Sequence, residues 1–204
     1  MLNKLTTLTS TFALVLCALF TSVTCSQTTE TKVEWNRFRG PNGSGVHPTS
    51  NAPLEWSTEQ NLKWKCPLPG YGRSSPIVVG DRVFLTSHSA ETFGKQGYEK
   101  YLLCIHLQKG KILWQRKINR RESKDRPFKL NGRDSGHAPH TPVSDGKSVF
   151  SYFGTDGLWA FDLDGKKLWH LESGTEKHPN NWGTGASPIV HRQFVIINLS
   201  LIHI

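Results

Sequence analysis

The sequence predicts an all-β fold: a β-propeller of four-stranded antiparallel blades, incomplete, with about two full blades and part of a third. Two observations predict it. A hairpin pattern that begins with a proline occurs three times, and a further strand pair that carries a tryptophan follows the first two occurrences. One unit occupies roughly 45 to 50 residues, which is the period of a four-stranded propeller blade.

The hairpin comes first in each unit. Its three copies are "SSPIVVGDRVFL", "HTPVSDGKSVFS" and "ASPIVHRQFVII", with Pro76, Pro142 and Pro188 in third place and an apolar pair seven residues after each proline. Two short strands joined by a tight turn produce this pattern. The hairpin therefore supplies the first two strands of each blade.

The third and fourth strands follow in the first two units. They read "YLLCIHL" with "KILWQRKI", and "GLWAFDL" with "KKLWHLES", joined by "QKGK" and "DGK". Asp164-Gly165 predicts a two-residue hairpin turn in which both residues take positive φ. The two full blades are expected over residues 74–118 and 141–173.

The tryptophan of each fourth strand is expected to lie across the gap between neighbouring blades, where it buries roughly 150–250 Å². Small residues and a turn glycine leave room for it. The sequence thus predicts a set of structural blade-docking residues. They are Trp64, Trp114, Trp169, Gly110, Gly165, Ala160 and Asp162.

The chain begins like an exported protein. Residues 1–25 hold Lys4, an uncharged run and then small polar residues, which predicts a signal peptide; the run is too short to span a bilayer. Residues 26–61 are expected to form an N-terminal linker, and residues 62–204 the partial propeller. The protein is expected in the periplasm; membrane association through a lipidated Cys25 is an open alternative, and so is an uncleaved anchor.

Two cysteines fall in the expected strands. Cys66 and Cys104 each lie in an apolar run, which favours buried free thiols, whereas export also permits a bridge between them. The cysteines show no zinc-type spacing. We therefore expect no metal site formed by these residues.

The chain carries a formal net charge of +9. Many of its basic residues lie between Lys109 and Arg133, where the acids are Glu122 and Asp125. Outside the cytoplasm such a segment can bind anionic lipid or polysaccharide rather than nucleic acid. The alternative is that it is a solvated loop with no partner. The expected partner is an envelope protein or polymer, with no nucleic acid.

Three motifs contain residue types found in catalytic or metal sites, and each also has a structural interpretation. His137 and His140 lack a third ligand, so they are expected to be loop residues. The run 134–137, "DSGH", has the residue types of a hydrolase triad without the nucleophile elbow. Asp162 begins "DLDG", which lacks the remaining ligands of a calcium loop. No catalytic or metal residue is therefore assigned.

Two further tryptophans lie outside the docking series. These are Trp159 and Trp182. Trp182, in "NNWGTGASP", precedes an innermost strand and is expected to be a packed loop anchor; the alternative is that a planar ligand stacks on it. "GPNGSG", residues 40–45, lacks the strand and helix of a phosphate-binding loop and is interpreted as part of the linker.

On these residues the chain resembles the pyrroloquinoline-quinone (PQQ)-like β-propeller repeat proteins. Their docking motif is Ala-x-Asp-x-x-x-Gly-x-x-x-Trp. The second repeat matches at Ala160, Asp162, Gly165 and Trp169 in a version shortened by one residue, and the first at Gly110 and Trp114. Longer stretches such as "WNRFRGPNGSG" and "NWGTGASPIV" are similar to exported, planctomycete-type members of this group.

The resemblance implies two kinds of function. Some relatives are protein-binding platforms without a cofactor, such as the propeller lipoprotein of outer-membrane assembly. Quinoprotein dehydrogenases use PQQ with calcium and carry a pair of adjacent cysteines, which this chain lacks. A non-catalytic scaffold module of the cell envelope is therefore expected, without cofactor. The alternative is a PQQ-dependent alcohol or sugar dehydrogenase.

The resemblance also implies how the ring closes. In these relatives an N-terminal strand, here "LKWKCPL" at residues 62–68, completes the last blade. The chain instead ends in "FVIINLSLIHI" within the third unit. The sequence is therefore expected to be the truncated N-terminal portion of a longer propeller, and a non-functional fragment is a third hypothesis.

Overall fold

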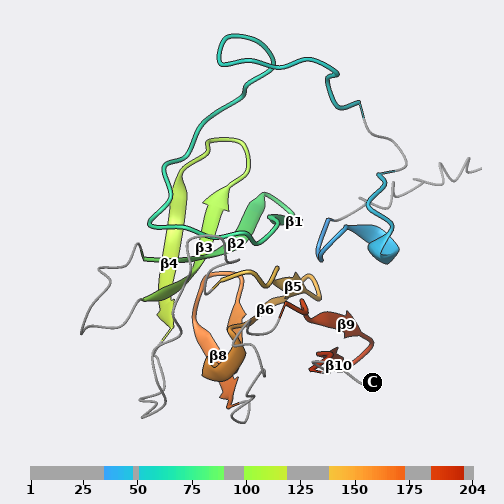
Figure 1. Ribbon diagram of the computed structural model, residues 1–204, viewed down its shortest axis with the longest axis vertical. Coiled ribbons are helices and arrows are strands. Elements are labelled where there is room, and N and C mark those ends of the chain that lie inside the picture. The colour runs from blue at the N-terminus through green and yellow to red at the C-terminus, as the bar shows by residue number, and fades with distance from the viewer. Residues whose placement is uncertain (1–34, 48–50, 90–98, 119–137, 173–184, 200–204) are drawn as a thin grey trace, which may run out of the picture. The chain divides into compact units, whose positions relative to one another are not determined.

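The computed structural model describes residues 35–47, 51–89, 99–118, 138–172 and 185–199 (Figure 1). All of them belong to one compact unit, which runs from Val33 to Ile204. Their secondary structure is strand apart from two short 3-10 turns, which confirms the all-β prediction. No helix within these ranges has the length and apolarity needed to cross a bilayer.

The first sheet contains four antiparallel strands in chain order: β1 (Ile77–Val79), β2 (Arg82–His88), β3 (Lys100–His106) and β4 (Ile112–Ile118). A single row of paired residues crosses it. Ile77 pairs with Phe84, Phe84 with Cys104, and Cys104 with Trp114. Because residues paired directly across neighbouring strands point to the same face, this row places apolar side chains on one side of the sheet.

The second sheet repeats this order with shorter strands: β5 (Val143–Ser144), β6 (Ser148–Tyr152), β7 (Leu158–Asp162) and β8 (Lys167–Leu171). The matching row runs from Val143 through Phe150 and Ala160 to Trp169. A 3-10 turn, η2 (Gly154–Asp156), joins β6 to β7. The two meanders are thus successive copies of one unit.

A third hairpin follows, formed by β9 (Ile189–His191) and β10 (Phe194–Ile196). Its register places Val195 opposite Val190, as Val83 stands opposite Val78 in the first copy. The described strands therefore comprise two complete four-stranded units and the first hairpin of a third, as the sequence predicts.

The larger apolar core lies between the two sheets. Phe84, Leu102 and Cys104 of the first sheet are fully buried against Val149 and Trp159 of the second. A second cluster covers the opposite face of the second sheet. It contains Val143, Phe150, Tyr152, Leu158 and Ala160, with Val190, Val195 and Ile197 packed against it. Sheet packs on sheet in succession, which is the arrangement of propeller blades.

The turn between β7 and β8 differs from the prediction. Of the Asp-Gly pair only Gly165 takes positive φ, at 81°. The connection spans residues 163–166, and it closes with Gly165 N–H donating to Asp162 O at 3.1 Å and Asp162 N–H donating to Lys166 O at 2.9 Å. The β7–β8 register also shifts between Ala160 and Phe161, as the β3–β4 register does between Cys104 and Ile105.

Residues 62–68 form no strand among the described residues, and the last blade that the resemblance implies for them is not among these residues, so that interpretation stays a prediction. A strand exists only through hydrogen bonds to a neighbour, and "LKWKCPL" has no ladder partner there. Cys66 is consequently half-buried rather than buried. Cys104, on β3, is fully buried, and both thiols are free, as expected.

Residues 35–47, which the sequence analysis assigns to the linker, are folded into a compact turn. The 3-10 turn η1 (Pro41–Gly43) follows Gly40, whose φ is 64°. The Trp35 ring covers Gly40 so closely that a Cβ there would lie 2.3 Å from it. This turn contacts the first strands of both sheets through Trp35 and Asn36.

Candidate functional site

The interface between the two sheets contains Trp114 and Gly165 of the predicted docking residues. Trp114, from β4, lies against the β7–β8 turn, and its Nε1 donates to Leu163 O at 3.0 Å. A Cβ on Gly165 would lie 2.8 Å from the Trp114 ring. The indole therefore fits only because residue 165 is glycine.

The same arrangement occurs one unit earlier. Trp64 Nε1 donates to Leu107 O at 2.8 Å, and a Cβ on Gly110 would lie 2.4 Å from the Trp64 ring. Leu107 and Gly110 belong to the β3–β4 turn, as Leu163 and Gly165 belong to the β7–β8 turn. Each indole thus hydrogen-bonds the turn of the following unit and covers its glycine.

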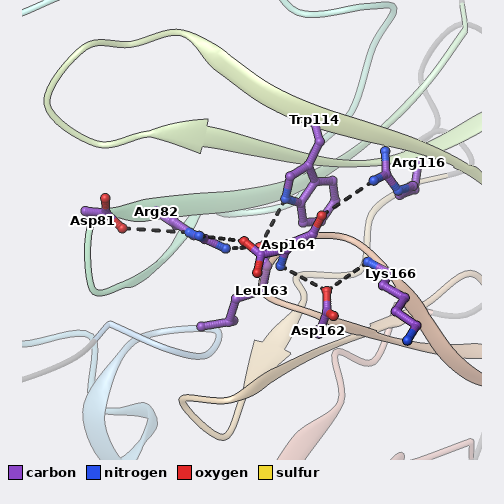
Figure 2. Close-up of polar contacts among 8 residues, drawn as sticks. All are labelled: Asp81, Arg82, Trp114, Arg116, Asp162, Leu163, Asp164 and Lys166. Carbon is purple, nitrogen blue, oxygen red and sulfur yellow. Dashed lines mark hydrogen bonds and ion pairs between the residues drawn. The ribbon is translucent and has the colours of Figure 1, made fainter.

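Arginines reinforce the Trp114 contact, as Figure 2 shows. Arg82 pairs with Asp164 at 2.8 Å and also donates to Leu163 O. Arg116 Nε donates to Gly165 O at 2.5 Å, and its guanidinium lies 5.3 Å from the Trp114 ring centroid. One turn of the second sheet therefore receives hydrogen bonds from three side chains of the first, Arg82, Trp114 and Arg116.

A buried ion pair links the sheets at the opposite ends of their strands. Lys100 Nζ lies 2.8 Å from Asp156 Oδ2, and the two side chains are 7% and 5% exposed. The same ammonium donates to Phe153 O at 2.8 Å. A buried pair needs such additional hydrogen bonds, because leaving water costs each charge several kcal/mol. The interface is thus held by polar contacts at both ends and by an apolar core between them.

Hydroxyls before the repeat prolines form a further link. Thr141 Oγ1 accepts from Ser75 N–H at 3.0 Å, and Ser187 Oγ accepts from Thr141 N–H at 2.9 Å. Each residue stands directly before Pro76, Pro142 or Pro188. The sequence analysis missed this ladder, although the signal is visible as "SSP", "HTP" and "ASP".

The innermost strands of the two sheets are bridged by the N-terminal turn. Trp35 O accepts from Val78 N–H on β1 at 2.8 Å, and Asn36 O accepts from Ser144 N–H on β5 at 2.9 Å. The Asn36 side chain donates back to Ser144 O at 2.9 Å. Nothing in the residue pattern around Asn36 predicted this contact.

The remaining docking residues occupy the far side of the second sheet. Ala160 is fully buried and stands opposite Trp169, which leaves room for the indole. The Trp169 ring lies 5.8 Å from that of Phe150, yet Trp169 is 41% exposed. Its role in docking a following blade stays a prediction.

Asp162 caps its own turn. Its Oδ1 accepts from Asp164 N–H at 3.0 Å and from Lys166 N–H at 2.8 Å. His106 does the same in the first sheet, where Nδ1 accepts from Gln108 N–H at 3.1 Å. In the parts of the chain that the structure describes, no three His, Cys, Asp or Glu side chains gather as a metal site would require.

Trp159 is a packed anchor. It is 5% exposed, donates to Asp156 O at 2.8 Å and stacks on His170 with centroids 3.9 Å apart. His140, 3% exposed, packs edge-on to Tyr152. His137, the "DSGH" run at 134–137, Trp182, Cys25 and the expected signal peptide lie outside the described residues.

The cysteine chemistry follows from burial. Desolvation raises the pKa of the Cys104 thiol to about 12, although Arg82 nearby acts in the other direction. A thiol with so high a pKa stays protonated at neutral pH and is a poor nucleophile or ligand.

On the first sheet's other face, hydrogen bonds from Lys117 and Tyr101 lower the pKa of Glu99.

Comparison with known proteins shows similarity to a repeat family and to solved structures. A family model described as "Outer membrane protein assembly factor BamB" matches residues 98–202, about half of the chain. A solved "Europium-containing methanol dehydrogenase" is 16% identical with a TM-score of 0.42; the match covers 67% of this chain and 22% of that one. The chain therefore spans about a fifth of that enzyme's length. No curated protein matches.

Proposed function

Because the chain belongs to the PQQ-like repeat family described as outer membrane protein assembly factor BamB, we propose that it is a non-catalytic scaffold of the cell envelope. Its blades present loops to a protein partner at the outer membrane. The family match carries this proposal, because its span of 98–202 contains the second blade whole and the strands β3 and β4 that dock on it.

The construction of the interface supports a scaffold role. Trp114 and Arg82 fix one end of the blade pair, and Lys100 with Asp156 fixes the other. Loops that leave a rigid pair of sheets keep their mutual spacing, which a binding surface needs. The hydroxyl ladder adds a fixed spacing between the first strands.

The partner is expected to be an envelope protein. The net charge of +9 favours an acidic surface on that partner, since complementary charge speeds encounter and is screened by salt. Export through the expected signal peptide, residues 1–25, places the chain in the same compartment as such a partner. An anchor at Cys25 would hold it at the membrane surface.

Capture and reconstitution test the proposal. The full chain, tagged at its C-terminus, is incubated with envelope extract; captured proteins are identified by mass spectrometry, purified and titrated against the chain. We expect saturable binding that weakens about tenfold or more between 50 and 300 mM salt, because a basic surface loses affinity as counterions compete. If no purified envelope protein binds saturably, the scaffold function is wrong.

A second assay addresses the enzyme alternative. The chain is reconstituted with PQQ and calcium and assayed for dye-linked oxidation of alcohols and sugars. We expect no turnover above a boiled control. Clear turnover that depends on both PQQ and calcium would replace the scaffold by a quinoprotein dehydrogenase.

A further inference from the structure

The fourth strands of the two sheets, β4 and β8, each contain a β-bulge directly before the tryptophan. The register of β4 skips Leu113, the residue before Trp114. The register of β8 skips Leu168, the residue before Trp169. A bulge turns a side chain out of the regular alternation of its strand. The same type of residue is therefore displaced at the same place in both repeats.

Both displaced leucines are exposed. Leu113 and Leu168 each have 47% of their surface open to solvent. A single exposed leucine is ordinary on a protein surface. Two leucines with equal exposure at equivalent bulges are instead a repeated surface feature.

A lysine precedes each of these leucines by two residues. Lys111 and Lys166 are exposed, and Lys109 adds a third ammonium group on the other side of Gly110. Within the described ranges none of these three lysines makes an ion pair. The stretches 109–118 and 165–171 contain no Asp or Glu. Each leucine is therefore accompanied by a lysine that has no acidic neighbour within its own stretch.

The acids that precede Lys166 are already engaged, as Figure 2 shows. Asp164 pairs with Arg82 at 2.8 Å. Asp162 Oδ1 accepts from the backbone N–H groups of Asp164 and Lys166, at 3.0 and 2.8 Å. An arginine and backbone amides thus occupy these carboxylates, and the lysine ammonium group stays available to an external anion.

The chemistry of these side chains indicates the ligand. An ammonium group binds an anion, whereas an aliphatic side chain gains free energy only when it leaves water for an apolar phase. A bilayer that contains anionic lipid offers phosphates and an apolar phase together, and it offers them repeatedly, so that one surface fits both repeats. An anionic polysaccharide has no apolar phase, and an acidic protein would need a separate pocket for each leucine.

We propose that Lys111 with Leu113 and Lys166 with Leu168, together with Lys109, form a binding surface for an anionic lipid bilayer. The lysines contact lipid phosphates, and the leucines enter the boundary between headgroups and acyl chains. The surface rests neither on the proposed scaffold function nor on a lipid anchor.

Vesicle sedimentation tests the contribution of charge. The full chain is mixed, at about 50 mM salt, with vesicles of phosphatidylcholine alone or with about one third phosphatidylglycerol. We expect partitioning at least about tenfold stronger to the anionic vesicles, because each lysine near a negative surface adds attraction. The variant that removes the charges carries Lys109→Gln, Lys111→Gln and Lys166→Gln. It should lose at least about tenfold in partitioning.

A matched control removes the same number of charges from exposed residues elsewhere. It carries Arg73→Gln, Lys147→Gln and Arg192→Gln. This control should partition to the anionic vesicles within about twofold of wild type, because attraction to the lipid surface acts only over about a Debye length.

A second comparison tests the leucines. Leu113→Ser combined with Leu168→Ser should weaken partitioning to the anionic vesicles at least about fivefold, although every charge is kept. The matched control is Leu54→Ser combined with Leu199→Ser, which changes two other exposed leucines and should partition like wild type. Glutamine replaces serine at residues 113 and 168 if circular dichroism shows that the serine variant is unfolded.

Two results would overturn the proposal. One is equal partitioning of wild type to neutral and anionic vesicles, and the other is an equal loss in either variant and its matched control. Residues 1–25 are common to all variants, so their contribution cancels in each comparison. Because no protein partner is present, failure here is separate from failure of the capture experiment.

Discussion

The two faces of the second sheet carry similar side chains but differ in what covers them. On the face toward the first sheet, Trp114 reaches across and lies on Gly165. On the other face the third hairpin covers the inner strands through Val190 and Val195, whereas Trp169 on β8 is 41% exposed.

This difference shows that a docking tryptophan is buried by a neighbouring blade and not by its own sheet. Trp114 and Trp169 stand at matching places, opposite Cys104 and Ala160 respectively. The described residues place a turn with a glycine against the first indole but not against the second. The tryptophan therefore contributes stability only where a neighbouring turn offers a carbonyl and a glycine.

The largest effect is expected when the two tryptophans are truncated separately. Trp114→Ala removes an indole from the interface together with its bond to Leu163 O, and should lower the free energy of unfolding by about 3–5 kcal/mol. Trp169→Ala should cost about 1 kcal/mol, because much of its surface is already in water. Urea denaturation measures both; equal losses would contradict the comparison.

The ion pairs at the two ends of the interface differ in burial and should differ in cost. Lys100→Met leaves Asp156 buried without its cation and should cost about 3 kcal/mol. Arg82→Met, whose partner Asp164 is 81% exposed, should cost about 1 kcal/mol. Raising the salt concentration should weaken the wild-type contribution of Arg82 and leave that of Lys100 nearly unchanged. A Lys100→Met variant as stable as Arg82→Met would be evidence that burial does not decide these costs.

The glycine under the indole gives a smaller effect. Gly165→Ala places a Cβ 2.8 Å from the Trp114 ring at a φ of 81°, and should cost about 2 kcal/mol. Gly80→Ala is the matched control, since its φ is 60° and no atom lies within 4 Å of the added Cβ. It should cost about 1 kcal/mol, from the backbone alone. The difference between the two variants, measured by thermal unfolding, reports the contacts of the added Cβ with Trp114 and Arg116.

The repeats themselves could be predicted from the sequence because they depend on local rules. A proline, an alternating run and a turn glycine determine a hairpin within about ten residues. The recurrence of Trp64, Trp114 and Trp169 then indicates an indole between neighbouring blades, but not which turn it contacts. These are the parts of the interface in which the chain repeats its own pattern.

The contacts that escaped prediction join residues far apart that share no repeat. Lys100 and Asp156 stand at matching places, two residues before Leu102 and Leu158, but they carry opposite charges, so comparison of the repeats hid the pair. Asn36 reaches Ser144 across 108 positions. The Asp-Gly turn was wrong for a local reason: Asp162 accepts two backbone N–H groups, which favours the longer turn.

The smallest effect is expected at the cysteine that distinguishes the first sheet from the second. Cys104→Ala installs the residue that the second sheet has at Ala160, and should cost about 1 kcal/mol at pH 8 for the lost volume. The free energies of unfolding of wild type and Cys104→Ala should then converge as the pH rises. Burial raises the pKa of Cys104 to about 12, from an ordinary 9.0, so the folded state keeps a proton that the unfolded state releases.

That stability is fully present below pH 9 and is lost between pH 9 and 12, so wild type should lose about 1 kcal/mol more than Cys104→Ala on going from pH 8 to pH 10. Urea denaturation at the two pH values measures this difference. Cys66→Ala, half-buried and outside the interface, is the control and should follow wild type. If Cys104→Ala instead keeps a constant offset from wild type at both pH values, Cys104 is reached by water, and the interface between the sheets is looser than its packing indicates.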